Sequence, residues 1–518
     1  MLVPSTLRAP TRFDPQRLVW LLPVAVYLAV RFAGTGHLER GVGALLAAGI
    51  VVVAARHADR AVLVLIAGFP FQTIALAQLY AWGVPASIVR PLASWKEAIA
   101  FGLVIAAFRG RADSRAHDHR RLDLLDRLAL CYVLIVVIYA AVPGLFAPDA
   151  PSALSARFIA FRQSAVFVAL LVAARHAVFP PGFLARAGRV ALVTAAAVGA
   201  IALYEWAFSD TWNRWAVRDA RVTAYQVEVL DIRPRNFFDI RYYGPVAGRQ
   251  VVRVGSVLFS PLTLGFYLLI GFAVGIERAV RAPSARVVAA LGAVALALVA
   301  TQTRSAILGA LLIAVVALRP LPGRRPHGRV RFALLLTAGL LLALPVAASS
   351  GLAARATGAF TGEEKSATAH VASFFRGVET LIADPLGRGL ATSAGAGLRF
   401  AREEAVIAEN SYLQVGNETG LTSMAVFAAL SVALVFRLRR AATSVGDPTA
   451  AAVFGAAVGL TVGAFFLHTW ADLVVSWTFW VLAGAAVGAA DRTTAPVEGV
   501  RFAHDGANAA SWYLPERG

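Results

Sequence analysis

The segment from about Ser366 to Leu421 carries a dense set of polar and ionisable side chains between two long apolar runs, so chemistry is expected there. Glu409 stands at the start of an expected membrane helix. A carboxylate at that position is costly unless it is solvated or paired, and the helix dipole favours its ionised form. A carboxylate beside a reacting hydroxyl can act as a general base. Glu409 is therefore the first candidate for a catalytic residue.

His370 and Arg376 belong to a segment over residues 367 to 383 whose apolar residues follow helical spacing. This spacing predicts an amphipathic helix that lies on the membrane surface. An exposed or interfacial histidine is the simpler interpretation of His370.

Asn410 and Ser411 open a second helix in the stretch AENSYLQ. Ser411 and Gln414 have the spacing of a capping box, and Asn410 could cap the helix as well. Helix capping is therefore the structural alternative to any functional role for these two residues.

Arg253 and Arg304 lie at expected helix starts on the same face of the membrane. Arg253 opens the stretch RVGSVLFSPLTLGFYL, and Arg304 lies in the tight turn TQTRSA between two spans. Guanidinium groups keep their charge and can donate two hydrogen bonds to one phosphate, so their convergence suits a diphosphate. Their positive field would also stabilise a leaving pyrophosphate. The alternative is that they reach the lipid headgroups.

Metal and nucleotide chemistry have no support in the sequence. No set of His, Cys, Asp and Glu on the outer face has metal-site spacing, so we expect no metal and no cofactor. Gly387-Arg388-Gly389 has no strand before it and is not a nucleotide fingerprint. The single Cys131 excludes a disulfide within one chain.

The composition is that of a polytopic membrane protein. Of the 518 residues, 58% are hydrophobic and 15% are charged, whereas soluble domains carry about a quarter charged residues. Apolar windows of membrane-spanning length recur along the chain. We predict an all-α fold of about 14 (12 to 14) transmembrane helices, with spans at 17–33, 41–55, 61–82, 94–108, 124–145, 158–175, 189–207, 255–276, 285–303, 305–318, 330–348, 411–436, 450–468 and 471–489.

The formal net charge of +19 is almost all arginine, and it predicts an orientation rather than a nucleic-acid partner. With the N-terminus inside, every even-numbered connector is basic, as the positive-inside rule requires. We therefore expect the cytoplasmic (inner) membrane, with both termini cytoplasmic. The expected divisions are N-terminal spans (1–207), an outer loop (208–254), central spans (255–348), a large outer loop (349–410), C-terminal spans (411–490) and a tail (491–518).

The first outer loop has too many aromatic residues for a disordered linker, and it carries eight arginines against five acidic residues. Arginine on the outer face runs against the positive-inside bias, which suggests an anionic ligand. Binding of these aromatic and arginine side chains to lipid headgroups is an equally good alternative.

Four stretches in order, RVGSVLFSPLTLGFYL, TQTRSAILGALL, HVASFFRGVETLIADPLGRGL and ENSYLQVGNETGL, make residues 250 to 435 resemble the O-antigen ligase and polymerase family of bacterial membrane glycosyltransferases. The resemblance implies a GT-C-like helical bundle with an undecaprenyl-diphosphate-linked glycan donor and a glycan acceptor. It also implies flippase and chain-length partners, and neither a nucleotide sugar nor a metal.

The resemblance also assigns roles to residues. Arginines at positions like Arg253, Arg304 and Arg376 are thought to hold the donor diphosphate in that family. The ligases have a His-Asn pair where this chain has Glu409 and Asn410. The departure favours a polymerase over a lipid A-core ligase, with either Glu409 or His370 as the base.

Two other functions stay open. One is ligation of a finished glycan to a lipid or protein acceptor. The other is a lipid-linked oligosaccharide flippase or transporter, although transporters typically show repeats and broken helices that meet at mid-membrane. This chain instead concentrates its ionisable groups at one surface.

Overall fold

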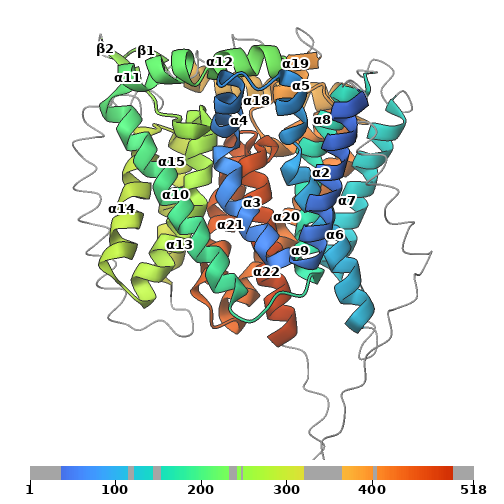
Figure 1. Ribbon diagram of the computed structural model, residues 1–518. Helices are drawn as coiled ribbons and strands as arrows, with labels where there is room; N and C mark the ends of the chain where they lie inside the picture. The colour runs from blue at the N-terminus through green and yellow to red at the C-terminus, as the bar shows by residue number, and fades with distance from the viewer. Residues whose placement is uncertain are drawn as a thin grey trace, which may run out of the picture.

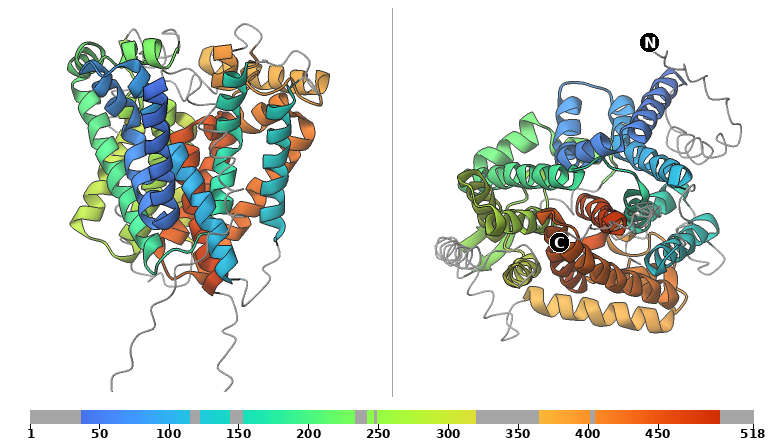
Figure 2. Two further views of the ribbon diagram at one scale, coloured as in Figure 1. Left: turned by 45° about the vertical axis from the view of Figure 1, so that its right-hand side comes forward. Right: turned by 90° about the horizontal axis from the view of Figure 1, so that it is seen from below.

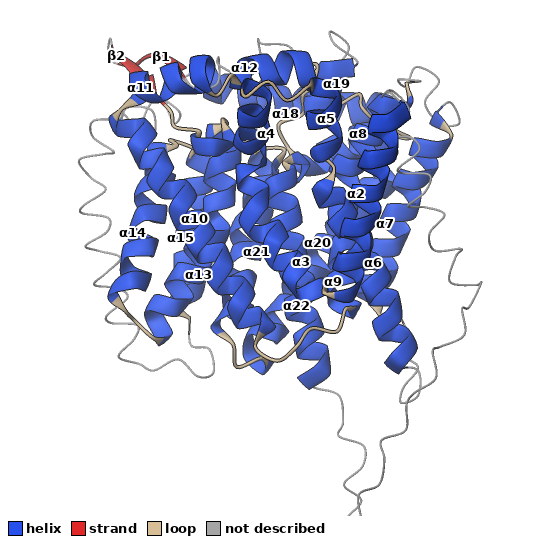
Figure 3. Cartoon of the chain, in the orientation of Figure 1, coloured by secondary structure: helices blue, strands red, loops and turns tan. Residues whose placement is uncertain are grey.

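Runs of apolar residues, each long enough to cross a bilayer, form the helices of an almost entirely helical bundle (Figure 1). The computed structural model describes residues 37–114, 122–143, 153–232, 242–246, 249–319, 365–400 and 405–493. Within these residues a two-stranded antiparallel hairpin, β1 (Tyr242–Val246) and β2 (Arg249–Val252), is the exception to the all-α prediction (Figure 3).

Eight helical segments in the described part are long and apolar enough to span a membrane. They are α3 to α4 (Ala58–Gly68 and Gln72–Ala81, joined by η2, Phe69–Phe71), α5 to α6 (Ala86–Leu92 and Trp95–Ser114), α7 (Leu124–Ala141), α10 (Phe183–Ala207), α13 (Pro261–Arg281), α20 (Ser411–Ser444), α21 (Pro448–Phe466) and α22 (Leu473–Thr493). A ninth span is the pair α8 (Leu154–Ser164) and α9 (Val166–His176), which bends by 47°.

Three shorter apolar helical stretches accompany these spans in the described part: Gly43–Arg56 of α2 (His37–Arg56), α14 (Ala285–Ala300) and α15 (Arg304–Leu318). Together with the nine spans they fall on every predicted span that lies within the described residues. The predicted spans 17–33 and 330–348 lie outside those residues, so the total of fourteen stays a prediction. Several predicted boundaries were wrong by a few residues; α13, for example, begins at Pro261 rather than 255, because Ser260 caps it there.

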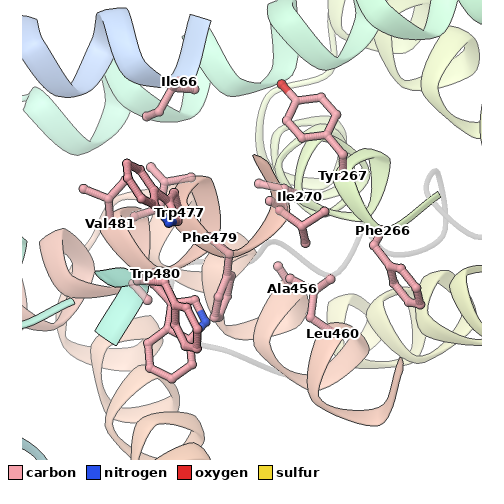
Figure 4. Close-up of a cluster of buried hydrophobic side chains, with 14 of the residues drawn as sticks. Ile66, Phe266, Tyr267, Ile270, Ala456, Leu460, Trp477, Phe479, Trp480 and Val481 are labelled. Carbon is pink, nitrogen blue, oxygen red and sulfur yellow. The ribbon is translucent and has the colours of Figure 1, made fainter. Parts of the chain in front are cut away.

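The core of the bundle consists of large aromatic side chains and closely approaching small residues. Trp477, Phe479 and Trp480 of α22 are almost fully buried, and they face residues of α3, α13 and α21 (Figure 4). A Cβ added at Gly484 or Gly488 would lie 2.3 Å from a backbone oxygen of α9. This close approach is typical of membrane helices that pack through small residues.

One end of the bundle is held by a network of ion pairs. Arg175 of α9 contacts Asp123 at 2.6 Å, Asp126 at 3.0 Å and Asp491 at 2.8 Å, and Arg437 of α20 joins the same network. These contacts tie together α7, α9, α20 and α22. Burial raises the pKa of Asp123, but hydrogen bonds from Arg175 and the Asp126 backbone outweigh it and hold the pKa at about 2.

The opposite end carries the short elements that belong to both predicted outer loops (Figure 1). From the first loop these are α11 (Ser209–Arg214), the π-helical turns η4 (Trp215–Asp219) and η5 (Tyr225–Val229), α12 (Val222–Ala224) and the hairpin. From the second loop they are α18 (Lys365–Ala383) and α19 (Ala394–Phe400). In the described part of the first loop, Trp212 and Tyr225 are buried. We refer to this end as the loop end.

Helix α20 is broken at Gly420, a feature that the predicted span 411–436 does not contain. The loop after α18 fills the break. The Arg388 N–H donates to Asn417 O at 2.7 Å, Gly389 N–H donates to Glu418 O at 3.0 Å, and Leu421 N–H donates to Pro385 O at 2.9 Å. Part of the second outer loop therefore supplies the hydrogen bonds that the helix gives up.

Candidate functional site

Helix α18 lies across the direction of the spanning helices, beside α20 (Figure 2). Val371, Phe375 and Ile382 are well exposed, whereas Leu381 is buried against Leu413 of α20. The helix therefore presents apolar side chains outward, as the amphipathic pattern predicts for a helix at a membrane surface.

One face of α18 lies against residues 407 to 409. His370, Ser373 and Gly377 have the i, i+3, i+7 spacing that places side chains on one side of a helix. The Ser373 hydroxyl donates to Ile407 O and accepts from the Glu409 N–H at 3.1 Å. A Cβ at Gly377 would lie 2.7 Å from the Ala408 Cβ, so glycine permits this close approach.

This packing brings the two candidate catalytic residues together. Nδ1 of His370 forms an ion pair with Oε2 of Glu409. Their side chains are 36% and 27% exposed, so both are partly open to solvent. A carboxylate that holds Nδ1 fixes the orientation of the imidazole and leaves Nε2 as the nitrogen that can exchange a proton.

Asn410 is the N-cap of α20, as the structural alternative predicted. Its Oδ1 accepts from the Tyr412 and Leu413 N–H groups at 2.8 and 2.9 Å, and its Nδ2 donates to Phe465 O at 2.9 Å. The predicted capping box of Ser411 and Gln414 is wrong, because Ser411 instead donates to Leu467 O at 3.0 Å. The predicted contact between Asn410 and substrate stays a prediction, and the buried side chain makes Asn410 a poor candidate.

Arg253 and Arg304 meet at the turn between α14 and α15. The buried Arg253 side chain donates to Thr301 O and to Thr303 Oγ1, both at 2.8 Å, and Arg304 follows as the first residue of α15. Arg253 therefore holds the turn that precedes α15 through these hydrogen bonds. Arg304, the first residue after that turn, is half-buried. Arg376 lies on α18, six residues after His370, with an exposed side chain.

A turn between α21 and α22 connects these two groups. Phe465, at the end of α21, and Leu467, in the turn, accept the hydrogen bonds from Asn410 and Ser411 described above. Asp472, at the other end of the turn, is hydrogen-bonded to Thr263 of α13 and interacts with His468. Thr263 in turn donates to Ser260 Oγ at 3.0 Å, and Thr303 donates to the neighbouring Pro261 O at 3.0 Å. A continuous set of contacts thus runs from Glu409 to Arg253.

His468 and Asp472 are candidate residues that the sequence reasoning missed. Burial raises the pKa of the Asp472 carboxyl, while His468 and the Thr263 hydroxyl oppose that rise. Such a group favours the protonated state more than an exposed aspartate does. The only sequence signal was the position of HTWAD at the loop end between two predicted spans.

Charged residues within the bundle have partners that the sequence did not reveal. Glu97 pairs with Arg162 at 3.0 Å and with Lys96 at 3.4 Å, and Glu205 accepts from the Gly255 and Ser256 N–H groups. Glu418 of α20 is 2% exposed and accepts from Ser393 N–H at 3.3 Å, just before the helix break. Glu418 is therefore an ionisable group in the interior of the bundle that the sequence reasoning did not single out.

The described residues contain no group of three or more His, Cys, Asp and Glu that could hold a metal ion. Comparisons of the chain with protein-family models and with curated proteins found no match. The functional argument therefore depends on the residues of the site itself.

Proposed function

We propose that the chain is a membrane glycosyltransferase that polymerises glycan repeat units carried on undecaprenyl diphosphate, at the outer face of the cytoplasmic membrane. The observation that carries the proposal is the ion pair between His370 and Glu409, which is linked to Arg253 and Arg304 by contacts through the segment between α21 and α22. The proposal unites a proton acceptor with fixed cations, which are the two requirements of glycosyl transfer from a diphosphate.

In the proposed reaction, His370 Nε2 accepts the proton of the acceptor hydroxyl while Glu409 holds Nδ1 and stabilises the imidazolium. The acceptor oxygen attacks the anomeric carbon of the donor and forms the new glycosidic bond. The bond between that carbon and the diphosphate oxygen breaks, and its electron pair leaves with the lipid diphosphate. Arg304 and Arg376 would neutralise the departing charge, and Arg253 would position Arg304.

The test is the lipid-linked glycan profile of cells that lack the protein and carry wild type, Glu409→Gln or His370→Gln. We expect single lipid-linked repeats to accumulate with both variants, because loss of a general base typically costs about 10²- to 10⁴-fold in rate. Glu379→Gln is the matched control, since Glu379 is an exposed carboxylate on the same helix. The proposal would be refuted if Glu409→Gln, at the same protein level as wild type, gave polymer of normal amount and length.

The same profile separates the two competing functions. Long lipid-linked chains would indicate a ligase that transfers finished glycan to a lipid or protein acceptor. Repeats trapped on the cytoplasmic side would indicate a flippase. The flippase gains support from the break in α20 and the bend between α8 and α9, because broken helices are common in transporters.

A further inference from the structure

Two interrupted helices meet inside the bundle at Glu418, a carboxylate that the proposed reaction does not use. Helix α20 breaks at Gly420, two residues after Glu418. Helix α8 ends at Ser164, where the chain bends by 47° into α9. The Ser164 hydroxyl lies 3.5 Å from Oε2 of Glu418, so the two interruptions are in contact. In transporters, small ions bind where broken helices meet in this way.

The second outer loop covers Glu418 from one side. Oε1 of Glu418 accepts from the Ser393 N–H at 3.3 Å, and the Ala391 N–H also donates to the carboxylate. The same loop fills the break in α20 through the backbone hydrogen bonds described above. A ligand bound by Glu418 would therefore lie between this loop and the broken helix.

No cation in the described part of the chain compensates the Glu418 carboxylate. Glu418 is 2% exposed, and among the described residues no lysine, arginine or histidine pairs with it. The buried Glu97, by contrast, has Lys96 and Arg162 as partners. A single carboxylate within a membrane bundle is costly unless a positive charge accompanies it. Glu418 therefore calls for a positive partner that these residues do not supply.

Two further oxygens beside Glu418 lack partners. The side chains of Ser393 and Tyr132 are fully buried, and neither hydroxyl has a hydrogen-bond partner within the described residues. Ser393 contacts Glu418 through its backbone, and Tyr132 of α7 is near enough to interact electrostatically with the carboxylate. Buried hydroxyls without partners are costly. A ligand that binds oxygen would satisfy both hydroxyls together with Glu418.

The spacing of Ser164 and Glu418 suits a shared cation better than a direct hydrogen bond. Hydrogen bonds between two oxygens typically span about 2.5 to 3.0 Å, which is shorter than the 3.5 Å found here. Cations of the size of sodium bind oxygen at about 2.4 Å, so two ligands at right angles lie about 3.4 Å apart. Hard cations prefer oxygen ligands, and a single positive charge balances a single carboxylate.

We propose that Glu418, Ser164, Ser393 and Tyr132 form a binding site for sodium, which joins the second outer loop to the break in α20. The four residues come from α20, α8, the loop before α19, and α7, so an occupied site ties four segments together. The inference does not depend on the proposed function. It adds an ion whose binding stabilises the loop between α18 and α20.

Binding of radioactive sodium to the purified protein in detergent tests this inference. Saturable binding is measured at constant ionic strength, with choline chloride in place of the sodium chloride that is left out. We expect wild type to bind and Glu418→Gln to lose binding. Ser393→Ala and Tyr132→Phe should each weaken the affinity about tenfold, since each removes one oxygen that contacts a charge.

Tyr267→Phe is the matched control for Tyr132→Phe. Tyr267 of α13 is also a buried tyrosine whose hydroxyl lacks a hydrogen-bond partner among the described residues, and it lies outside the proposed site (Figure 4). Tyr267→Phe should bind sodium as wild type does. Equal affinities in Ser393→Ala, Tyr132→Phe and Tyr267→Phe would overturn the proposed set of ligands, even if Glu418→Gln failed to fold.

The unfolding midpoint supplies a second measurement. A ligand that binds only the folded state stabilises it, so sodium should raise the midpoint of wild type and of Tyr267→Phe but not that of Glu418→Gln. The midpoints without sodium show whether each variant is folded. Absence of saturable binding in wild type, with a midpoint that responds to pH but not to sodium, would indicate a protonated Glu418 and overturn the inference. Equal sodium binding by Glu418→Gln and wild type would overturn it as well.

Discussion

Replacing Gly387 by alanine should disrupt the contact between the second outer loop and the broken helix α20. Gly387 has φ of +80°, a conformation that costs other residues about 1 to 2 kcal/mol. A Cβ at this position would lie 2.5 Å from Gly420 N and 2.9 Å from Glu418 O. The backbone must therefore move away from the helix break.

That movement would weaken the hydrogen bonds that close the break, those of Arg388, Gly389 and Leu421 with residues across it. At about 1 kcal/mol for each bond, losing one or two of them adds to the cost of the strained φ. We expect Gly387→Ala to lower the free energy of unfolding by about 2 to 4 kcal/mol. Polymer should also shorten, because the loop between α18 and α20 positions both catalytic candidates.

Gly395→Ala is the matched control for this prediction. Gly395 lies in α19, in the same outer loop, and an added Cβ there meets nothing within 4 Å. Alanine favours a helix over glycine by up to about 1 kcal/mol, so Gly395→Ala should be neutral or stabilising. Denaturation of the purified variants in detergent measures the difference. Equal unfolding midpoints for Gly387→Ala and wild type would refute the reasoning.

Three further predictions concern stability. Arg175→Met should cost about 3 to 5 kcal/mol, because it leaves the buried Asp126 carboxylate without its main partner; denaturation measures this, with the exposed Arg439→Met as control. Asn410→Ala should cost about 1 kcal/mol through loss of the N-cap, whereas Asn410→Asp keeps the acceptor and should cost less. Asp123, with a folded pKa of about 2 against 3.8 ordinarily, contributes stability above about pH 4 that is lost as the pH falls toward 2. Asp123→Asn should make the free energy of unfolding less dependent on pH in this acidic range. The same loss of stability on acidification in Asp123→Asn and wild type would contradict the prediction.

The membrane helices could be predicted from sequence because an apolar run of sufficient length is a local property. The break at Gly420 could not, because no local signal divides the predicted span 411–436 into two helices. The break exists because Arg388 and Gly389 bring backbone donors to the freed carbonyls. That compensation comes from another part of the chain, and no local pattern reports it.

In the candidate site, too, local features could be predicted from the sequence and contacts between distant segments could not. The spacing of His370, Ser373 and Gly377 predicts a shared face of α18, but not that residues 407 to 409 lie on it. Asn410 was correctly weighed as a cap because capping is local. Glu97 and Arg162 come from two separate helices, α6 and α8, so no spacing rule in the sequence could pair them.

The arrangement of buried charge bears on the choice between transfer and transport. A transporter needs its binding site to be reachable in turn from both faces, which places that site near mid-membrane. Glu418 and the break at Gly420 satisfy part of that description, since Glu418 lies about 10 Å along α20 from Ser411. However, Glu418 is 2% exposed and is held by the second outer loop through Ser393. The ion pair of His370 and Glu409 and the group of Arg253 and Arg304 lie at the loop end. A polar loop locked into a helix break, below a partly exposed acid-base pair, is better suited to fixing substrates at one surface than to passing them through the bundle.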